Sequence, residues 1–203
     1  MKKILLIGLA ISIFGTTNAQ TEKSNLTIGL HFGTQEYNGD LGSEFFSFNQ
    51  FRAYGLSVSK YLTPYWDVQG MITGNTFSPN DFSGMDKTQF LDLNIIAKFK
   101  FNNGKWLKES SKFAPYLFIG FGDGITKAEH YTSNTSNISV DVNALAGLGF
   151  HFIINEKWGI DLKTKYTYMW NDNMDNKMDV NDFQDQALMT TIGITYAFSS
   201  LKK

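Results

Sequence analysis

Three features of the sequence predict an all-β protein, folded as an eight-stranded antiparallel up-and-down transmembrane β-barrel. Apolar and polar residues alternate over eight separate stretches, which is the pattern of strands with two different faces. Aromatic residues make up 15% of the chain and glycines number 18, yet the mean hydropathy is only −0.21. After the N-terminal segment, no apolar run is long enough for a membrane-spanning helix. These features conflict with a helical membrane protein and agree with a barrel, whose strands are apolar on one face only.

The eight alternating stretches are separated by segments rich in polar residues. They cover residues 26–32, 51–61, 66–76, 91–101, 115–125, 140–152, 158–170 and 191–198. In the fourth stretch, for example, Leu91 and Leu93 flank Asp92, and the alternation continues to residue 101. The stretch 115–125 is apolar on both faces, so the sequence leaves its register open.

We expect the apolar face of the strands to point outward, into lipid. It supplies roughly forty residues, whereas eight strands enclose room for only a small packed core or one small ligand. The opposite face is rich in Gly, Ser, Asn, Asp and Lys, which suits a polar lumen. Trp158 at one end of its stretch, with Tyr168 and Trp170 at the other, has the spacing of two aromatic girdles. A soluble lipocalin-like barrel, with its apolar face inward, is the alternative.

Residues 1–19 are predicted to be a secretory signal peptide, and residues 20–203 an outer-membrane β-barrel domain. Two lysines precede an apolar run from Ile4 to Phe14, and a small-residue cleavage site follows at residues 17–19. The chain has no cysteine, so neither a disulfide nor a lipoprotein anchor is expected. Cleavage removes Lys2 and Lys3, which lowers the 18 basic residues to 16 against 19 acidic ones, a net charge of −3. Nucleic acid is therefore not an expected partner.

The lengths of the connections predict how the barrel is oriented. Long connections follow the first, third, fifth and seventh stretches, at residues 37–49, 77–88, 126–138 and 171–186. The alternate connections are short, at residues 61–65 and 154–157, with a long exception at 102–114. Outer-membrane barrels place long loops outside the cell and short turns in the periplasm. Both termini are therefore expected in the periplasm of a Gram-negative bacterium.

Several motifs carry a resemblance to a known family. The last stretch ends in Ile192, Ile194, Tyr196 and Phe198 on one face, which resembles the C-terminal insertion signal of bacterial outer-membrane barrels, although residues 199–203 follow it. Tyr37-Asn-Gly-Asp-Leu-Gly42, Lys100-Phe-Asn-Asn-Gly-Lys105 and Ala114-Pro-Tyr-Leu-Phe-Ile-Gly-Phe-Gly122 are similar to the OmpA-like barrel of Bacteroidota. The resemblance covers residues 25–199. A small barrel of the type IX secretion machinery shares the Tyr-x-Gly-Asp-Leu turn. Because the chain ends after the eighth strand, the family's peptidoglycan-binding domain, and with it wall anchoring, is not expected.

Three histidines are the first candidates for chemistry. His31 and His151 are predicted on the lumen face, and His130 in an external loop. Some eight-stranded outer-membrane barrels are lipid A deacylases or acyltransferases, which need a base beside a hydroxyl nucleophile and an orienting third group. The sequence shows no serine matched to a histidine. We therefore interpret His31 and His151 as lumen hydrogen-bonding residues and predict no catalytic, cofactor-binding or metal-binding residue.

Charged residues on the lumen face have two interpretations. They could line an ion path, or they could neutralise one another and plug the bore, because isolated charges in a narrow interior are costly. Pairing is the favoured interpretation, and we expect Lys163 to pair with a carboxylate on a neighbouring strand, Asp141 or another lumen aspartate. The set comprises Asp67, Asp92, Lys98, Lys100, Asp141, Asp161, Lys163 and Lys165.

The last long connection is acidic. It contains Asp172, Asp175, Asp179, Asp182 and Asp185 against Lys177 alone. The spacing lacks the ladder and the central glycine of an EF-hand calcium loop, so a solvated acidic surface is expected instead.

The sequence therefore predicts a small structural or scaffolding barrel of the outer membrane without catalysis. Its expected partner is outer-membrane lipid, with other outer-membrane or periplasmic proteins as further candidates. One alternative is an accessory subunit of a secretion or insertion machinery, for which the connection 102–114 would be a docking element. A narrow porin-like pore or a lipid-modifying enzyme is a more distant alternative.

Overall fold

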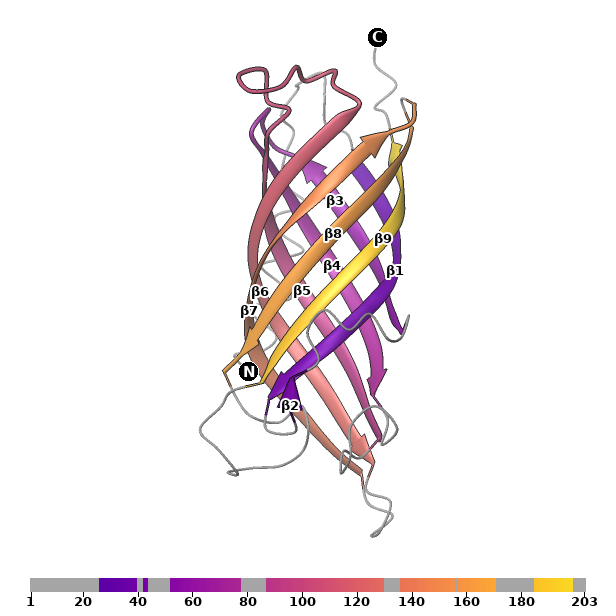
Figure 1. Ribbon diagram of the computed structural model, residues 1–203, viewed down its shortest axis with the longest axis vertical. Coiled ribbons are helices and arrows are strands. Elements are labelled where there is room, and N and C mark those ends of the chain that lie inside the picture. The colour runs from indigo at the N-terminus through magenta and orange to yellow at the C-terminus, as the bar shows by residue number, and fades with distance from the viewer. Residues whose placement is uncertain are drawn as a thin grey trace.

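The eight long strands of the structure, a computed structural model, form a closed barrel. The structure describes residues 26–39, 42–43, 52–77, 87–129, 136–155, 157–170 and 185–198. The strands are β1 (Leu26–Gly39), β2 (Gly42–Ser43), β3 (Ala53–Tyr61), β4 (Trp66–Phe77), β5 (Lys87–Lys100), β6 (Phe113–Glu129), β7 (Ser136–Ile153), β8 (Trp158–Met169) and β9 (Gln186–Phe198). All pairings are antiparallel and follow chain order, β1 also pairs with β9, and the two-residue β2 pairs with the end of β1 (Figure 1). The predicted fold class is confirmed.

The stagger of the strands sets the width of the barrel. Direct partners lead once around the sheet from Leu26 through Lys60, Val68, Ala97, Ile119, Ala146, Tyr166 and Leu188 to Glu36. The path returns to β1 ten positions further on, at residue 36 instead of 26. Eight strands with this stagger tilt by about 40° and enclose an interior that side chains alone can fill.

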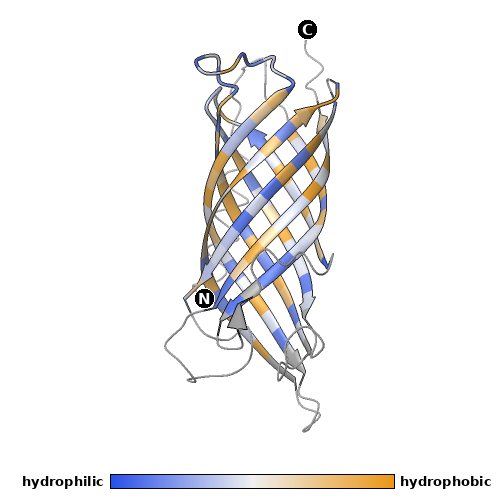
Figure 2. Ribbon diagram, viewed as in Figure 1, coloured by the Kyte–Doolittle hydropathy of each residue, from blue (hydrophilic) through white to orange (hydrophobic). Residues whose placement is uncertain are grey.

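The apolar face points outward, as predicted. Leu56, Ile119 and Ile194 are 58–63% exposed, whereas the lumen-facing His31 and Lys163 are 1–2% exposed. Figure 2 shows this alternation as hydrophobic and hydrophilic bands along the strands. A lipocalin-like arrangement, with the apolar face inward, is therefore excluded.

Strand β6 has the register that the sequence left open. Leu117, Ile119 and Phe121 are exposed on the outside of the barrel, and Tyr116 and Phe118 are buried in the lumen. The stretch is apolar on both faces because its inward side chains help to fill the lumen.

Several strands are longer than the alternating stretches predicted. β6 continues to Glu129 and β7 already begins at Ser136, and these two strands extend furthest at the bottom of Figure 1. Backbone pairing needs no apolar side chains, so the ladder continues past the segment that alternation identifies. The barrel end that carries these extensions is called the loop end here. The opposite end, with the connections 62–65, 101–112 and 154–157, is called the turn end.

The long connection at the turn end is an ordered turn built around Asn103. The Asn103 side chain donates to the Lys100 carbonyl at 2.8 Å and accepts from the amides of Lys105 and Trp106 at 3.1 and 3.3 Å. Gly104 has a φ of +83°, and its amide donates to the Leu107 carbonyl at 2.9 Å. The sequence did not explain why this connection is long. The structure shows that its residues form a compact hydrogen-bonded turn.

Some predicted features lie outside the described residues. These are the signal peptide (1–19), His130, Asp40 and Leu41 of the first motif, and all the aspartates of the acidic connection except the last one. That residue, Asp185, is fully buried, so the expectation of a solvated surface is wrong for this position. It directly precedes β9, and its carbonyl accepts the Met169 amide at 3.0 Å, which holds it inside the wall of the barrel. In the ranges that the structure describes, no helix is long and apolar enough to cross a membrane.

Candidate functional site

The lumen gathers the buried polar residues of the barrel, and Asp161 on β8 is the centre of one network. Its Oδ1 accepts a hydrogen bond from the Tyr116 hydroxyl at 2.8 Å, and its Oδ2 lies 3.0 Å from the Lys163 ammonium. Lys163 also donates to the Gln69 side chain at 3.4 Å. The network joins β8 to β6 and to β4 across the barrel, and it supplies a counter-charge and one hydrogen bond to a carboxylate that is 3% exposed.

The partner of Lys163 differs from the prediction. The sequence predicts a carboxylate on a neighbouring strand, whereas Asp161 lies two residues away on the same strand. Residues i and i+2 share a face of a strand, so the flexible lysine side chain can fold back to the carboxylate beside it. Only the three-dimensional structure, which places Gln69 and Tyr116 around this pair, decides between the candidate aspartates.

A second ion pair crosses the lumen closer to the loop end. The Lys165 ammonium lies 2.5 Å from Asp92 Oδ2, and Asn143 donates to Oδ1 of the same carboxylate at 2.8 Å. Lys165 is on β8 and Asp92 on β5, with two strands between them in the sheet, so the pair spans the interior. Pairing of lumen charges is thereby confirmed for these residues and for Asp67 and Lys100, 2.5 Å apart near the turn end.

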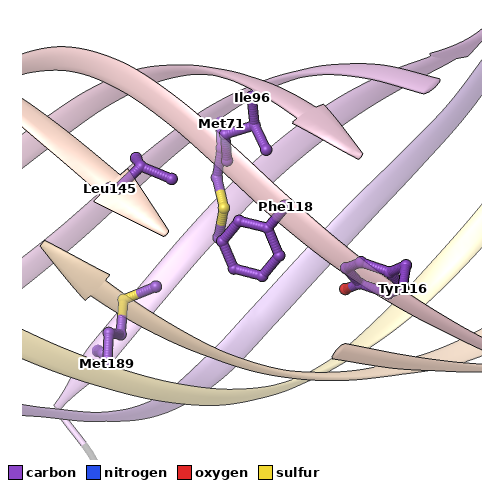
Figure 3. Packing of buried hydrophobic residues seen from close by; sticks show 7 residues of the cluster. Met71, Ile96, Tyr116, Phe118, Leu145 and Met189 are labelled. Carbon is purple, nitrogen blue, oxygen red and sulfur yellow. The ribbon is translucent and has the colours of Figure 1, made fainter. Parts of the chain in front are cut away.

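An apolar cluster, called the plug here, fills a further part of the lumen. Its members are buried and come from β3, β4, β5, β6, β7 and β9: Ala53, Met71, Ile96, Tyr116, Phe118, Leu145 and Met189. Figure 3 shows Met71, Phe118 and Leu145 reaching into the interior from different strands. The plug was not predicted from the sequence, because single apolar residues on a polar face carry no periodic signal. The only hint was the stretch 115–125, which is apolar on both faces.

Glycines of β7 make room for the aromatic rings of β6. Gly147 and Gly149 pair directly with Phe118 and Tyr116. A Cβ at Gly147 would lie 2.4 Å from the Phe118 ring, and one at Gly149 would lie 2.3 Å from the Tyr116 ring. The glycine-rich lumen face is therefore not empty, because rings from the neighbouring strand cover its glycines.

The two lumen histidines bind hydroxyl groups. His31 Nε2 lies 2.8 Å from Ser57 Oγ, and His151 Nε2 lies 3.0 Å from Thr195 Oγ1. The prediction that no serine matches a histidine is wrong, because β3 pairs with β1 and brings Ser57 beside His31. His31 Nδ1 is also 3.9 Å from Asp161 Oδ2, which completes a Ser–His–Asp sequence of contacts. All three residues are at most 4% exposed, so a substrate has no access to the serine.

The turn end of the lumen is hollow. A cavity of about 380 Å³ lies there, lined by residues of the strand ends and of all three turns. Tyr116 and Asp161 are among the lining residues and belong to the network described above, so they form its floor. Lys98 also lines the cavity, with its ammonium 4.8 Å from the centre of the Tyr116 ring. Within the described residues, no group of three or more His, Cys, Asp or Glu side chains could hold a metal ion.

A closed eight-stranded barrel with an apolar exterior and a filled polar lumen is the architecture of a small transmembrane barrel. Residues 6–198 match the family described as "Outer membrane protein beta-barrel domain", and the chain belongs to this family. The protein is therefore an outer-membrane barrel. No curated protein sequence matches it.

Several solved structures of similar fold are outer-membrane proteins. Neisserial surface protein A has a TM-score of 0.61 at 11% identity, over 86% of this chain and 96% of the other. A major outer membrane protein from Thermus thermophilus has a TM-score of 0.56 at 15% identity, over 87% and 100%. Ail, the attachment invasion locus protein of Yersinia pestis, has a TM-score of 0.53 at 16% identity, over 87% and 99%. At these identities the likeness shows the fold alone.

Proposed function

We propose that this protein is a structural or scaffolding barrel of the outer membrane that neither conducts ions nor catalyses a reaction. The observation that carries the proposal is the filled lumen. The Lys165–Asp92 pair spans the interior, and the plug occupies the space beside it. An ion crossing the barrel would have to break a buried pair and displace close-packed apolar side chains, both of which are costly.

Conductance in planar lipid bilayers tests this proposal. The wild-type barrel is expected to give no discrete current steps. A matched variant with Met71→Ala, Phe118→Ala and Met189→Ala, combined with Lys165→Ala and Asp92→Ala, removes plug side chains and the buried pair while leaving the exterior unchanged, and it is expected to conduct. Both proteins are first shown to be folded by their shifted mobility in unboiled detergent gels. Discrete steps from the folded wild-type protein would exclude the structural interpretation in favour of a pore.

The turn end is proposed to face the periplasm, so that both termini lie there. Two of the three connections at this end, 62–65 and 154–157, have only 4 residues, which supports the proposal because outer-membrane barrels keep their longer loops outside. The turn 101–112 adds no support, because its 12 residues exceed the 6 of the connection 130–135 at the loop end. A closer kinship with OmpA-like barrels of Bacteroidota is part of the same proposal. It rests on the motifs at residues 37–42, 100–105 and 114–122.

The contacts among Ser57, His31 and Asp161 do not change the proposal of a non-enzymatic barrel. Asp161 is engaged by Tyr116 and Lys163, and its distance of 3.9 Å from His31 exceeds a hydrogen bond. Asp161 therefore does not orient His31 as the general base that would activate Ser57 as a nucleophile. A fluorophosphonate probe is expected to leave Ser57 unlabelled in the folded barrel. Labelling that disappears in Ser57→Ala would support an enzyme instead.

A role as an accessory subunit is the second candidate function. Trp106 is 59% exposed on the ordered turn 101–112, where a neighbouring protein can reach it. A photo-crosslinking residue in place of Leu107 is expected to capture a reproducible protein partner if this role is correct. The same residue in place of Ile138, which is exposed near the other end of the barrel, is the control. Crosslinks to lipid alone at both positions would leave the isolated barrel as the functional unit.

A further inference from the structure

We propose that the cavity at the turn end binds a small anionic solute, whose carboxylate or phosphate group is held by the Lys98 ammonium. This inference goes beyond the proposed structural role. It assigns a ligand site to a lumen that does not conduct.

The shape of the cavity is that of a cup closed at its inner end. Its volume of about 380 Å³ lies within the range of small-molecule sites. Pro64, Ser110 and Asn155, one from each of the three turns, line it at the open end of the barrel. Tyr116, a member of the plug, closes the inner end together with its hydrogen-bond acceptor Asp161, and the other members of the plug lie beyond them. A solute can therefore enter from the turn end but cannot pass through.

The cavity lining itself carries as many lysines as carboxylates, but Lys163, which lies behind the lining, pairs with Asp161 and so leaves one lysine of the lining without a counter-charge. Asp67 is neutralised by Lys100, and Asp161 by Lys163. In the part of the chain that the structure describes, the half-buried Lys98 ammonium forms no ion pair within 4 Å and contacts the face of the Tyr116 ring.

Two exposed residues of opposite charge, Lys157 and Glu109, also line the cavity. Their charges cancel at the mouth, so they do not change the balance deeper inside. Lys98 therefore determines the sign of the solute that the cup attracts.

An ammonium group in this position favours an anionic ligand over a neutral or cationic one. A charged hydrogen bond to a carboxylate or phosphate oxygen is stronger in a cavity than in bulk water. The Tyr116 ring supports the lysine from one side and leaves its other donors available. The two lumen carboxylates nearest to the cup already bind lysines, so they do not offer a site for a cation.

Isothermal titration of the refolded barrel in a non-ionic detergent tests the proposal. Inorganic phosphate and succinate are the two probes, and they distinguish a phosphate ligand from a carboxylate ligand. Saturable binding of at least one probe is expected. Lys98→Gln is expected to weaken it by about tenfold or more, which corresponds to the loss of one charged hydrogen bond, and Lys98→Arg is expected to retain it.

The control variant is Lys105→Gln, which removes the same charge at the same end of the barrel but outside the cavity. It is expected to bind the probe as the wild-type protein does. Amide resonances of the wild-type barrel provide a second measurement that needs no variant, because binding in the cup should shift those of Asn102 and Gly159. The proposal is overturned by the absence of saturable binding, by an equal loss in Lys105→Gln, or by resonance shifts confined to residues outside the cavity.

Discussion

Lys165 and Asp92 are almost completely buried, and each depends on the other for neutralisation. Lys165→Met leaves the Asp92 carboxylate in the lumen with the uncharged Asn143 amide as a hydrogen-bond donor. Removing one partner of a buried pair typically costs about 3–5 kcal/mol of unfolding free energy, because the other charge is left uncompensated. Urea unfolding in detergent micelles measures this loss. The exposed Lys105→Gln is the control and should change stability by less than about 0.5 kcal/mol. Equal stabilities for the two variants would mean that water reaches the pair.

The Tyr116 hydroxyl stabilises the second lumen carboxylate, Asp161. Tyr116→Phe keeps the ring that covers Gly149 and removes only the donor, so we expect a loss of about 1.5–3 kcal/mol, typical of a hydrogen bond to a charged group. Tyr196→Phe is the matched control, because Tyr196 lies on the outer face beside Trp158. The same urea experiment compares the two variants, and a loss as small as that of the control would show that Asp161 does not need this bond.

The turn 101–112 illustrates what holds a single element in place. Gly104 has a left-handed backbone, and the nearest atom to a Cβ built there is Glu109 Oε1 at 3.8 Å. A side chain therefore fits, and only the backbone conformation resists it. Gly104→Ala is expected to destabilise the barrel by about 1–2 kcal/mol in urea unfolding, and Gly104→Asn by less, because asparagine tolerates this conformation. If both variants unfold like the wild type, the turn does not contribute to the stability of the folded barrel.

Strands β6 and β7 show how two elements divide the filling of the lumen. The large rings lie on β6, and the glycines that accept them lie on β7. On its own, the inner face of β6 is too apolar for a polar lumen, and the glycines of β7 would leave gaps. Pairing of the two strands places the β6 rings over the β7 glycines, which fills the gaps.

The orientation of the whole molecule can be tested because the chain has no cysteine of its own. Ser110→Cys introduces a thiol at the turn end, and Ser133→Cys introduces one in the connection between β6 and β7. In intact cells, a membrane-impermeant maleimide is expected to label only Ser133→Cys. After permeabilisation of the outer membrane it should label both. Labelling of Ser110→Cys in intact cells would place the turn end outside and reverse the proposed topology.

The sequence by itself determined the fold class and the direction in which each strand faces. Alternation with a period of two is a local property of each strand. Because lipid surrounds the barrel and its interior is too narrow for all the apolar side chains, the apolar face must point outward and the polar face inward. For this reason Leu56 and Ile194 are predicted outside, and Asp161 and Lys163 inside, without knowledge of any contact. The predicted spacing of Trp158 from Tyr168 also agrees with their positions at opposite ends of β8.

Only the tertiary structure decided which lumen residues meet. The contact between Lys165 and Asp92 joins strands that are not neighbours, and that between His31 and Ser57 depends on the register of β1 against β3. The stagger of ten residues around the barrel brings such positions to the same height, and no single strand contains this information. The plug and the cup arise from the same cause, because a lumen is filled by contributions from all its strands together. The polar face of each strand is therefore predictable from the sequence, but the register between strands decides which of its residues contact one another.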